Sequence, residues 1–416
     1  MGVERPDASW ATADSLEELT RLAETVGVDV VGSVTQKLPH PYSGTYVGKG
    51  KLQEIVDGRD SFAYDLILVD DELSPAQQRN LEKALDVKII DRTALILDVF
   101  ARRAQTHEGR LQVELAQLQY RLPRLTGMWT HLSRQAVGGV GLRGPGETQL
   151  EVDRREAMKR ISFIKRELLQ VHTHRQLYRS RRRDRPVAVV ALVGYTNAGK
   201  STLLNAITGA GVLAEDKLFA TLDPTSRAVK LGEGQSAIIT DTVGFIHKLP
   251  HQLVDAFRAT LEEVNRADVL LEVVDVSDSH AREHRQTVQQ VLNDLGAGDK
   301  PRLVAYNKAD LLDPTAADGE TPAPIVEGAV LVSAATGFGL DGLRVGLSAL
   351  LADLWEDVDV AVPYNEGELL SRVRERGTVD ISYRGRDVRI RGRVTPALAG
   401  ELRAAAQHWK NAARGT

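Results

Sequence analysis

The chain has 416 residues and a mass of 45.5 kDa, which predicts roughly two to four domains rather than one. It contains no cysteine, so disulfides, thiolate catalysis and cysteine-based zinc sites are excluded. The net charge of −4 gives no general indication of a nucleic-acid binder. Because no basic segment precedes an apolar core at the N-terminus and no apolar run is long enough to span a membrane, we expect a cytoplasmic protein.

The first segment, residues 1–106, alternates strand and helix signals. Three short β-branched runs predict strands at Val28–Val34, Tyr64–Val69 and Val87–Ile90. Helical stretches are predicted near Lys51–Val56 and over Pro75–Leu85. Strands that alternate with helices favour an α/β unit with a parallel sheet.

The second segment, residues 107–185, has helical periodicity. The apolar residues that share one face are Leu111, Leu115, Leu118 and Leu122, followed by Leu150, Ala157, Ile161, Ile164, Leu168 and Val171. This spacing predicts two amphipathic helices packed as an antiparallel hairpin. A glycine-rich loop, Gly138–Gln149, connects them, and six arginines lie within Arg175–Arg185.

The third segment, residues 186–356, begins with the continuous apolar run Val187–Val193, which is typical of a buried central strand. Similar runs recur at Ile238–Thr240, Val269–Val276, Leu303–Tyr306 and Ala329–Val332. The pattern predicts a doubly wound α/β domain with a mostly parallel sheet.

The last segment, residues 357–416, is predicted to form a small α/β unit. Its elements are a strand near Val358–Val362, a helix near Glu366–Arg376, a hairpin through Tyr383–Asp387 and a final helix.

A phosphate-binding motif follows the first strand of the third segment. It fits G-x₄-G-K-[ST] and comprises Gly194, Tyr195, Thr196, Asn197, Ala198, Gly199, Lys200 and Ser201. Glycines let backbone N–H groups surround phosphates, and a helix N-terminus favours the anion. Lys200 is expected to reach the β- and γ-phosphates, and the Ser201 hydroxyl to bind Mg²⁺.

Two further motifs surround the expected γ-phosphate. The strand-end sequence Asp241, Thr242, Val243 and Gly244 supplies a carboxylate that can hold Mg²⁺ through water and a glycine N–H for the γ-phosphate. The other motif lies in the sequence between the phosphate-binding motif and Asp241. It comprises Phe219, Ala220, Thr221, Leu222 and Asp223, with Thr225 shortly after. Either Thr221 or Thr225 can supply a Mg²⁺ ligand, and spacing alone does not separate them.

A fourth motif indicates which nucleotide base is bound. It follows a predicted strand and comprises Asn307, Lys308, Ala309 and Asp310. A fixed carboxylate accepts hydrogen bonds from guanine N1–H and N2–H₂, whereas adenine would leave it unpaired. The residues Ser333, Ala334 and Ala335 follow the next strand and are expected to support the base. The ordered motifs predict GTP and Mg²⁺ binding and disfavour a nucleotide kinase, which needs no guanine recognition. We assign catalytic roles to Lys200, Thr221 and Gly244.

The sequence resembles the HflX family of ribosome-associated GTPases over nearly its whole length. The motifs that carry the resemblance are GYTNAGKST, LFATLDPT and DTVGFIHKLP in the GTPase segment, with RTALILDVFARRAQTHEGRLQVELAQLQYRLPRL and GGVGLRGPGETQLEVDRR before it. The resemblance implies that Thr221 is the Mg²⁺ ligand. It also implies that the large (50S) ribosomal subunit and its rRNA are the partners, and that stalled or stressed 70S ribosomes are split. We expect a monomer, and Arg143, Arg181, Arg182 and Arg183 as RNA contacts.

One position affects the expected rate of hydrolysis. Phe245 follows Gly244, where Ras-like enzymes place the glutamine that orients the attacking water. Phenylalanine cannot donate or accept a hydrogen bond, so we expect slow hydrolysis by the free protein and stimulation by the ribosome. Two alternatives are that His247 substitutes for the glutamine and that the protein holds GTP as a scaffold without hydrolysing it.

Overall fold

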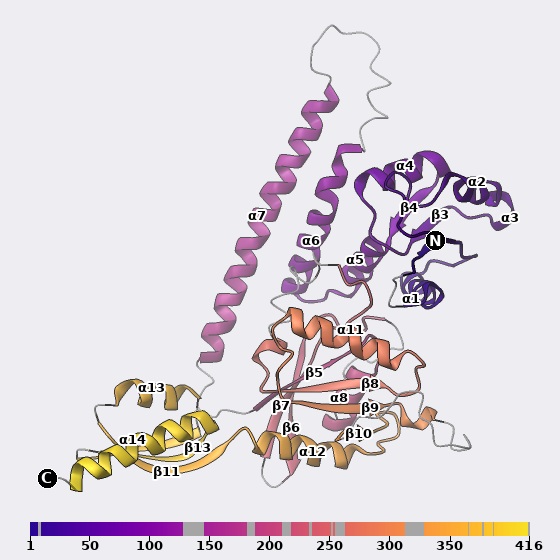
Figure 1. Ribbon diagram of the computed structural model, residues 1–416. Coiled ribbons are helices and arrows are strands. Elements are labelled where there is room, and N and C mark those ends of the chain that lie inside the picture. The colour runs from indigo at the N-terminus through magenta and orange to yellow at the C-terminus, as the bar shows by residue number, and fades with distance from the viewer. Residues whose placement is uncertain are drawn as a thin grey trace.

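The computed structural model describes residues 1–6, 10–127, 145–180, 188–209, 218–232, 235–250, 253, 263–312, 328–364, 366–376, 378–385 and 387–414. Figure 1 shows a central α/β layer, an N-terminal unit and a long helical hairpin above it, and a small C-terminal unit at one side. The mixed α/β class and the division into a nucleotide-binding unit and N-terminal units agree with the prediction. The boundaries after residues 106, 185 and 356 remain predictions.

The N-terminal unit contains short parallel strands surrounded by helices. Strands β1 (Gly2–Glu4) and β2 (Thr35–Lys37) form one parallel pair, and β3 (Leu66–Val69) and β4 (Lys88–Asp91) form another. The Asp70 N–H donates to the Met1 carbonyl oxygen at 3.0 Å, which connects the two pairs. The helices are α1 (Thr12–Thr25), α2 (Lys49–Asp57), α3 (Arg59–Phe62), α4 (Pro75–Leu85) and α5 (Arg92–Arg103).

The predicted strand at Val28–Val34 is wrong. These residues are not in a strand, and Val30 and Val31 are exposed by 42% and 57%. Valines favour a strand only where a second layer covers them, and neither of these two side chains is covered here. Pairing begins just afterwards, because the Gly2 N–H donates to the Val34 carbonyl oxygen at 3.0 Å and β2 starts at Thr35.

The helical hairpin consists of α6 (His107–Arg121), the 3₁₀ turn η1 (Leu122–Gly127) and α7 (Pro145–Ser180). Leu111 and Leu115 of α6 pack against Ile164 of α7, as the helical spacing predicted. The 36 residues of α7 span roughly 54 Å at 1.5 Å per residue, so α7 extends well beyond α6 (Figure 1). The predicted loop to Gln149 is too long, because α7 already begins at Pro145; its residues before Pro145 lie outside the described part.

The central unit is a six-stranded sheet in the order β10-β9-β8-β5-β7-β6. Only β6 is antiparallel to its neighbour among these strands. The strands are β5 (Ala188–Gly194), β6 (Thr225–Gly232), β7 (Gln235–Asp241), β8 (Val269–Asp275), β9 (Arg302–Asn307) and β10 (Val330–Leu331). Helices α8 (Lys200–Thr208) and α12 (Leu340–Ala352) cover one face, and α11 (Ala281–Asp294) packs on the other. The carboxyl ends of the parallel strands therefore form the edge that carries the motifs.

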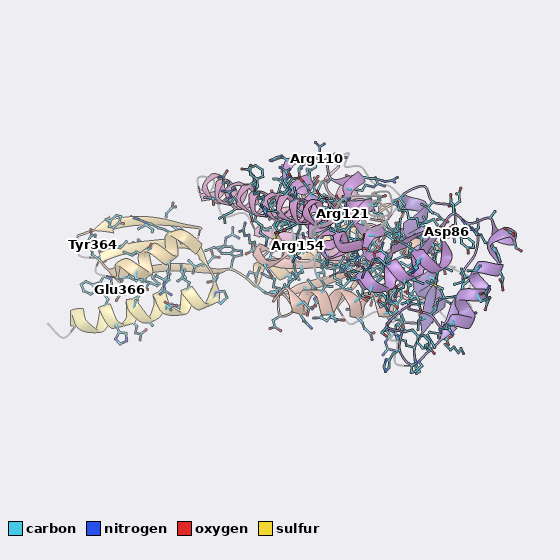
Figure 2. The ribbon with its side chains drawn as sticks, turned by 90° about the horizontal axis from the view of Figure 1, so that it is seen from above. Asp86, Arg110, Arg121, Arg154, Tyr364 and Glu366 are labelled. Atoms are coloured by element: carbon cyan, nitrogen blue, oxygen red, sulfur yellow. The ribbon has the colours of Figure 1, made fainter. Side chains whose placement is uncertain are left out.

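The C-terminal unit has its own core. Strands β11 (Glu356–Pro363), β12 (Thr378–Arg384) and β13 (Asp387–Val394) form an antiparallel sheet in the order β11-β13-β12. Helices α13 (Gly367–Arg376) and α14 (Pro396–Arg414) pack their apolar faces on it. All its predicted elements are confirmed. Figure 2 shows this unit, marked by Tyr364 and Glu366, at the opposite end of the molecule from Asp86 of the N-terminal unit.

A buried ionic network joins the N-terminal unit to the central sheet. The Arg92 guanidinium, 1% exposed, donates to Glu18 and to Asp70 at 2.6 Å each. Lys248, from the central unit, lies 2.5 Å from the Asp70 carboxylate and 2.6 Å from that of Asp71. Burial disfavours the charge of Asp70, but Arg92 and Lys248 outweigh this effect and hold the pKa of its carboxyl well below its usual value.

Replacing Arg92 with methionine is expected to lower the free energy of unfolding by about 3–5 kcal/mol, because the buried Glu18 carboxylate loses its cation and Asp70 keeps only Lys248. Urea unfolding near neutral pH measures this. Arg21→Met is the matched control, since Arg21 forms only an exposed pair with Glu17, and it should cost less than about 1 kcal/mol. Equal free energies of unfolding for the Arg92 and Arg21 variants would contradict the role given to Arg92.

Candidate nucleotide-binding site

The turn between β5 and α8 requires its glycines. Gly194 has φ +150°, and a Cβ there would lie 2.3 Å from the Val273 carbonyl oxygen. Gly199 has φ +87°, and a Cβ there would lie 2.3 Å from Nδ2 of Asn307. Only glycine fits both positions, so the backbone of residues 194–201 can curve around a ligand at the carboxyl edge of the sheet.

Lys200 lies inside this turn. Its Nζ donates to the carbonyl oxygens of Gly194 at 3.1 Å and Tyr195 at 2.8 Å, and the side chain is buried. Burial lowers the pKa of its ammonium to about 8, although the Asp241 carboxylate acts in the opposite direction. A buried cation beside a helix N-terminus is an electrostatic environment that favours a bound phosphate.

Oxygen atoms from three separate segments meet beside Lys200. Ser201 Oγ donates to Asp241 Oδ2 at 2.6 Å and lies 2.7 Å from Thr221 Oγ1. The other Asp241 oxygen and the Thr196 hydroxyl are buried without a hydrogen-bond partner among the described residues. Hydroxyl and carboxylate oxygens are donors that Mg²⁺ prefers, so this set fits that ion.

The two threonines that sequence spacing left open lie in different surroundings. Thr221 is the one beside Ser201. Thr225 begins β6, where it is paired in register with Asp241. Burial raises the pKa of the Asp241 carboxyl, with Lys200 opposing the shift. A second cation close to Asp241 would therefore stabilise its charged form.

The predicted base-recognition residues converge on the same edge. Asn307 Nδ2 donates to the Ala198 carbonyl oxygen at 3.0 Å, and its Oδ1 accepts from the Ala334 N–H at 2.9 Å. Ser333 Oγ donates to Asp310 Oδ1 at 2.5 Å, which orients that exposed carboxylate. Asn307 thus connects the phosphate turn with the loop after β10.

The Phe245 ring is buried in an apolar core. Its side chain is 1% exposed and belongs to the apolar core shared with the N-terminal unit. Its backbone N–H donates to the Gly194 carbonyl oxygen at 3.1 Å, and its carbonyl accepts from the Thr196 N–H at 2.8 Å. The Phe245 backbone therefore braces the phosphate turn while its ring lies in the apolar core.

His247 does not take the place of the missing glutamine in this structure. Its ring stacks on Trp10 with centroids 4.5 Å apart, and burial and the nearby cations lower the pKa of the imidazole to about 4. The backbone N–H of His247 donates to the Tyr195 hydroxyl at 2.7 Å, and that hydroxyl donates to Glu18. His247 thus belongs to the contact between domains.

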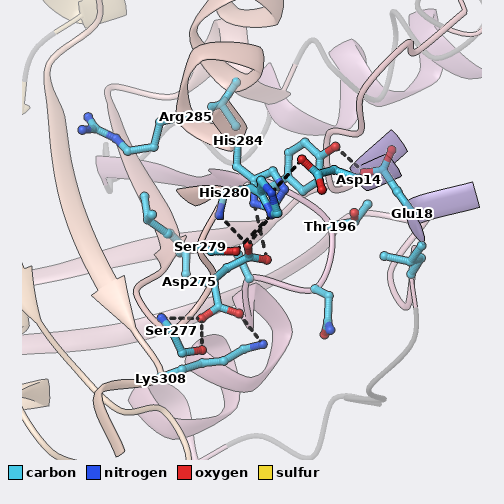
Figure 3. A pocket seen from close by; sticks show the side chains of 18 of the residues that line it. Asp14, Glu18, Thr196, Asp275, Ser277, Ser279, His280, His284, Arg285 and Lys308 are labelled. Atoms are coloured by element: carbon cyan, nitrogen blue, oxygen red, sulfur yellow. Dashed lines mark hydrogen bonds and ion pairs between the residues drawn. The ribbon is translucent and has the colours of Figure 1, made fainter. Parts of the chain in front are cut away.

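A cavity of roughly 360 Å³ lies between α1 and the phosphate turn (Figure 3). Asp14 and Glu18 of α1 face Thr196 on one side, and His280 of the central unit lies 2.9 Å from Asp14. On the opposite wall, Lys308 forms a 2.6 Å ion pair with Asp275. The sequence did not identify Glu18 or Asp14 as neighbours of the nucleotide motifs, because nothing in local spacing reports a contact between domains.

The RNA-contact candidates Arg143, Arg181, Arg182 and Arg183 lie outside the described residues. Within the described part of the chain, no group of three or more histidine, aspartate and glutamate side chains could hold a metal ion. No helix in that part is both long and apolar enough to cross a membrane.

The sheet order, the phosphate turn and the base-recognition residues define a P-loop GTPase. Three families match the chain in order: "GTP-binding GTPase N-terminal" over residues 13–101, "GTP-binding GTPase Middle Region" over residues 103–182 and "50S ribosome-binding GTPase" over residues 189–308. The chain belongs to the HflX family of GTPases, and it hydrolyses GTP.

The relatives cover most of the chain. GTPase HflX of Caldanaerobacter subterraneus is 48% identical over 391 residues, which is 94% of this chain and 90% of the relative. GTPase HflX of Escherichia coli K12 is 43% identical over 376 residues, covering 90% and 88%. A GTP-binding protein from Sulfolobus solfataricus, whose crystal structure was determined in complex with GDP, is 26% identical to this chain. The match covers 85% of this chain and 98% of the Sulfolobus chain, with a TM-score of 0.42.

Replacing Phe245 with glutamine is expected not to raise the rate of GTP hydrolysis by the free protein, because the side chain faces the core. It should also destabilise the fold by about 1–3 kcal/mol through burial of an unpaired amide. Phe245→Leu is the control that removes the ring without adding polar atoms. Single-turnover hydrolysis and thermal unfolding of both variants provide the measurement, and a tenfold faster reaction for the glutamine variant would refute this placement.

Proposed function

We propose that the protein is a GTP- and Mg²⁺-dependent switch that acts on the large ribosomal subunit. The observation that carries this proposal is the meeting of Ser201, Thr221 and Asp241 beside Lys200. These side chains come from the phosphate turn and from the two loops expected to respond to the γ-phosphate. A change at the γ-phosphate would therefore alter both loops at once.

In the proposed complex, Lys200 and the backbone of residues 194–201 bind the β- and γ-phosphates. Ser201 and Thr221 would hold Mg²⁺ directly and Asp241 through water; the ion would neutralise charge on the phosphates. The N–H of Gly244 would contact the γ-phosphate. Asp310 would accept from the guanine, with Asn307 and residues 333–335 holding the base loop. For residues 219–223 and 242–243 nucleotide contact remains a prediction.

Hydrolysis requires a water molecule in line with the γ-phosphorus. Its oxygen forms the new P–O bond as the bond to the β–γ bridging oxygen breaks, and the water proton passes to the phosphate, which leaves GDP and inorganic phosphate. Because the Phe245 ring lies in the core, this chain supplies no side chain at that position to orient the water. We infer that the free protein is slow and that the partner completes the site.

Three observations support the large ribosomal subunit as that partner. The GTPase domain matches a family described as 50S ribosome-binding. The sequence between the two hairpin helices is rich in glycine, and six arginines lie within Arg175–Arg185. The protein is net acidic, so this local basic charge is a specific feature. We propose contact with rRNA through Arg143 and Arg181–Arg183, a monomer in the cytoplasm, and a role in splitting or rescuing stalled 70S ribosomes or in 50S maturation under stress.

Purified 50S subunits are expected to raise GTP turnover about a hundredfold or more at fixed Mg²⁺, since a positioned catalytic group contributes that much. Matched amounts of 30S subunits are the control and should have little effect. Sedimentation of 70S ribosomes incubated with the protein and a non-hydrolysable GTP analogue then tests splitting. GTP binding with no stimulation by 50S subunits would contradict the ribosomal role.

A further inference from the structure

Asp223 contacts the N-terminus of the hairpin helix α6, although the residue and the helix are distant in the sequence. Its Oδ2 accepts hydrogen bonds from the backbone N–H groups of Gln105 and Thr106, both at 2.9 Å. Its Oδ1 accepts from the Thr106 hydroxyl. Thr106 is itself the N-cap of α6 and accepts from the Gly109 N–H at 3.0 Å. A carboxylate is favoured there by the unpaired N–H groups and by the helix dipole.

The loop of residues 219–223, which contains Asp223, is also fixed at a point before Thr221. The Phe219 ring is 2% exposed and meets Phe100 of α5 edge to face, with centroids 4.6 Å apart. Leu222 is 3% exposed in the same core. Thr221 therefore lies between an apolar anchor on α5 and a polar anchor on α6, while its own hydroxyl is 2.7 Å from Ser201.

We propose that Asp223 is a positioning residue that couples the hairpin to the metal site. It fixes the loop on α6, and this contact places Thr221 beside Ser201. The inference rests on the proposed role of Thr221 as a Mg²⁺ ligand. By thermodynamic reciprocity, binding that orders Thr221 also favours this position of α6, and a partner that displaces α6 weakens the metal site.

The simpler explanation is that Asp223 only stabilises α6 as an accessory cap. Gly109 distinguishes the two explanations. A Cβ at this position would lie 2.4 Å from Asp223 Oδ1, so alanine would displace the carboxylate. A Cβ there would also lie 3.1 Å from Thr106 Oγ1. Alanine is a better helix former than glycine, so this gain offsets part of the capping that α6 loses. A role in folding alone predicts no effect of Gly109→Ala on the metal site.

The experiment measures GTP hydrolysis by the full-length protein over a range of Mg²⁺ concentrations, together with thermal unfolding. The variants are Asp223→Ala, Gly109→Ala and the pair combined. Loss of a capping contact corresponds to a factor of about five to thirty in an equilibrium constant. We therefore expect each single variant to raise the half-saturating Mg²⁺ concentration about fivefold or more. The combined variant should add little, because both changes break one contact.

Control variants separate this effect from general damage. Thr106→Ser retains a hydroxyl donor and should behave like the unchanged protein. Thr106→Val removes one of the three hydrogen bonds to Asp223 and should shift the Mg²⁺ dependence in the same direction as Asp223→Ala, by a smaller amount. Glu114→Gln removes a different carboxylate of α6, one that pairs with Arg160 at 2.6 Å, and should leave the Mg²⁺ dependence unchanged.

The possible outcomes are distinct. Half-saturating Mg²⁺ within twofold of the unchanged protein for both Asp223→Ala and Gly109→Ala would overturn the coupling while leaving the GTPase function intact. A shift in Asp223→Ala alone, accompanied by a lower unfolding temperature, would reduce Asp223 to a structural cap. Hydrolysis by the unchanged protein that does not depend on Mg²⁺ would overturn the proposed metal site and this inference with it.

Discussion

The buried guanidinium of Arg92 is the interaction on which the arrangement of the two domains depends. A buried charge is tolerated only when it is fully paired, and Arg92 finds its partners in Glu18 and Asp70. Each partner then reaches the central domain. Glu18 accepts from the Tyr195 hydroxyl in the phosphate turn, and Asp70 pairs with Lys248 just after Phe245. Moving the domains apart would leave Lys248 without Asp70 and Glu18 without the Tyr195 hydroxyl, while Arg92 would keep both of its carboxylates.

This network makes the nucleotide site a product of both halves of the chain. The loop with Thr221 is held by α5 and α6, the loop with His247 and Lys248 by the N-terminal unit, and the phosphate turn by α1. In a single-domain GTPase such loops are restrained mainly by the nucleotide. In this protein the conformations of these loops also depend on the elements that carry the long hairpin. The state of the bound nucleotide and the position of the hairpin are therefore linked.

The sequence predicted the parts that depend on local pattern. The phosphate motif, the strand-end aspartate and the Asn307–Asp310 motif lie together because parallel strands bring their carboxyl ends to one edge. It did not predict contacts between distant elements, such as Asp223 on α6 or Tyr195 on Glu18, because no spacing rule reports them. The Val28–Val34 prediction was wrong for a related reason: β-branched residues predict a strand only if another layer covers them.

Hydrogen–deuterium exchange of the full-length protein tests the shared site most directly, by comparing GDP with a non-hydrolysable GTP analogue and Mg²⁺. The account predicts that amides of residues 218–223, the first turn of α6 and residues 246–250 all become slower to exchange together when the analogue binds. Protection confined to residues 218–223 and the phosphate turn, with the first turn of α6 and residues 246–250 unchanged, would show that the N-terminal domain does not respond to the nucleotide and would contradict the account.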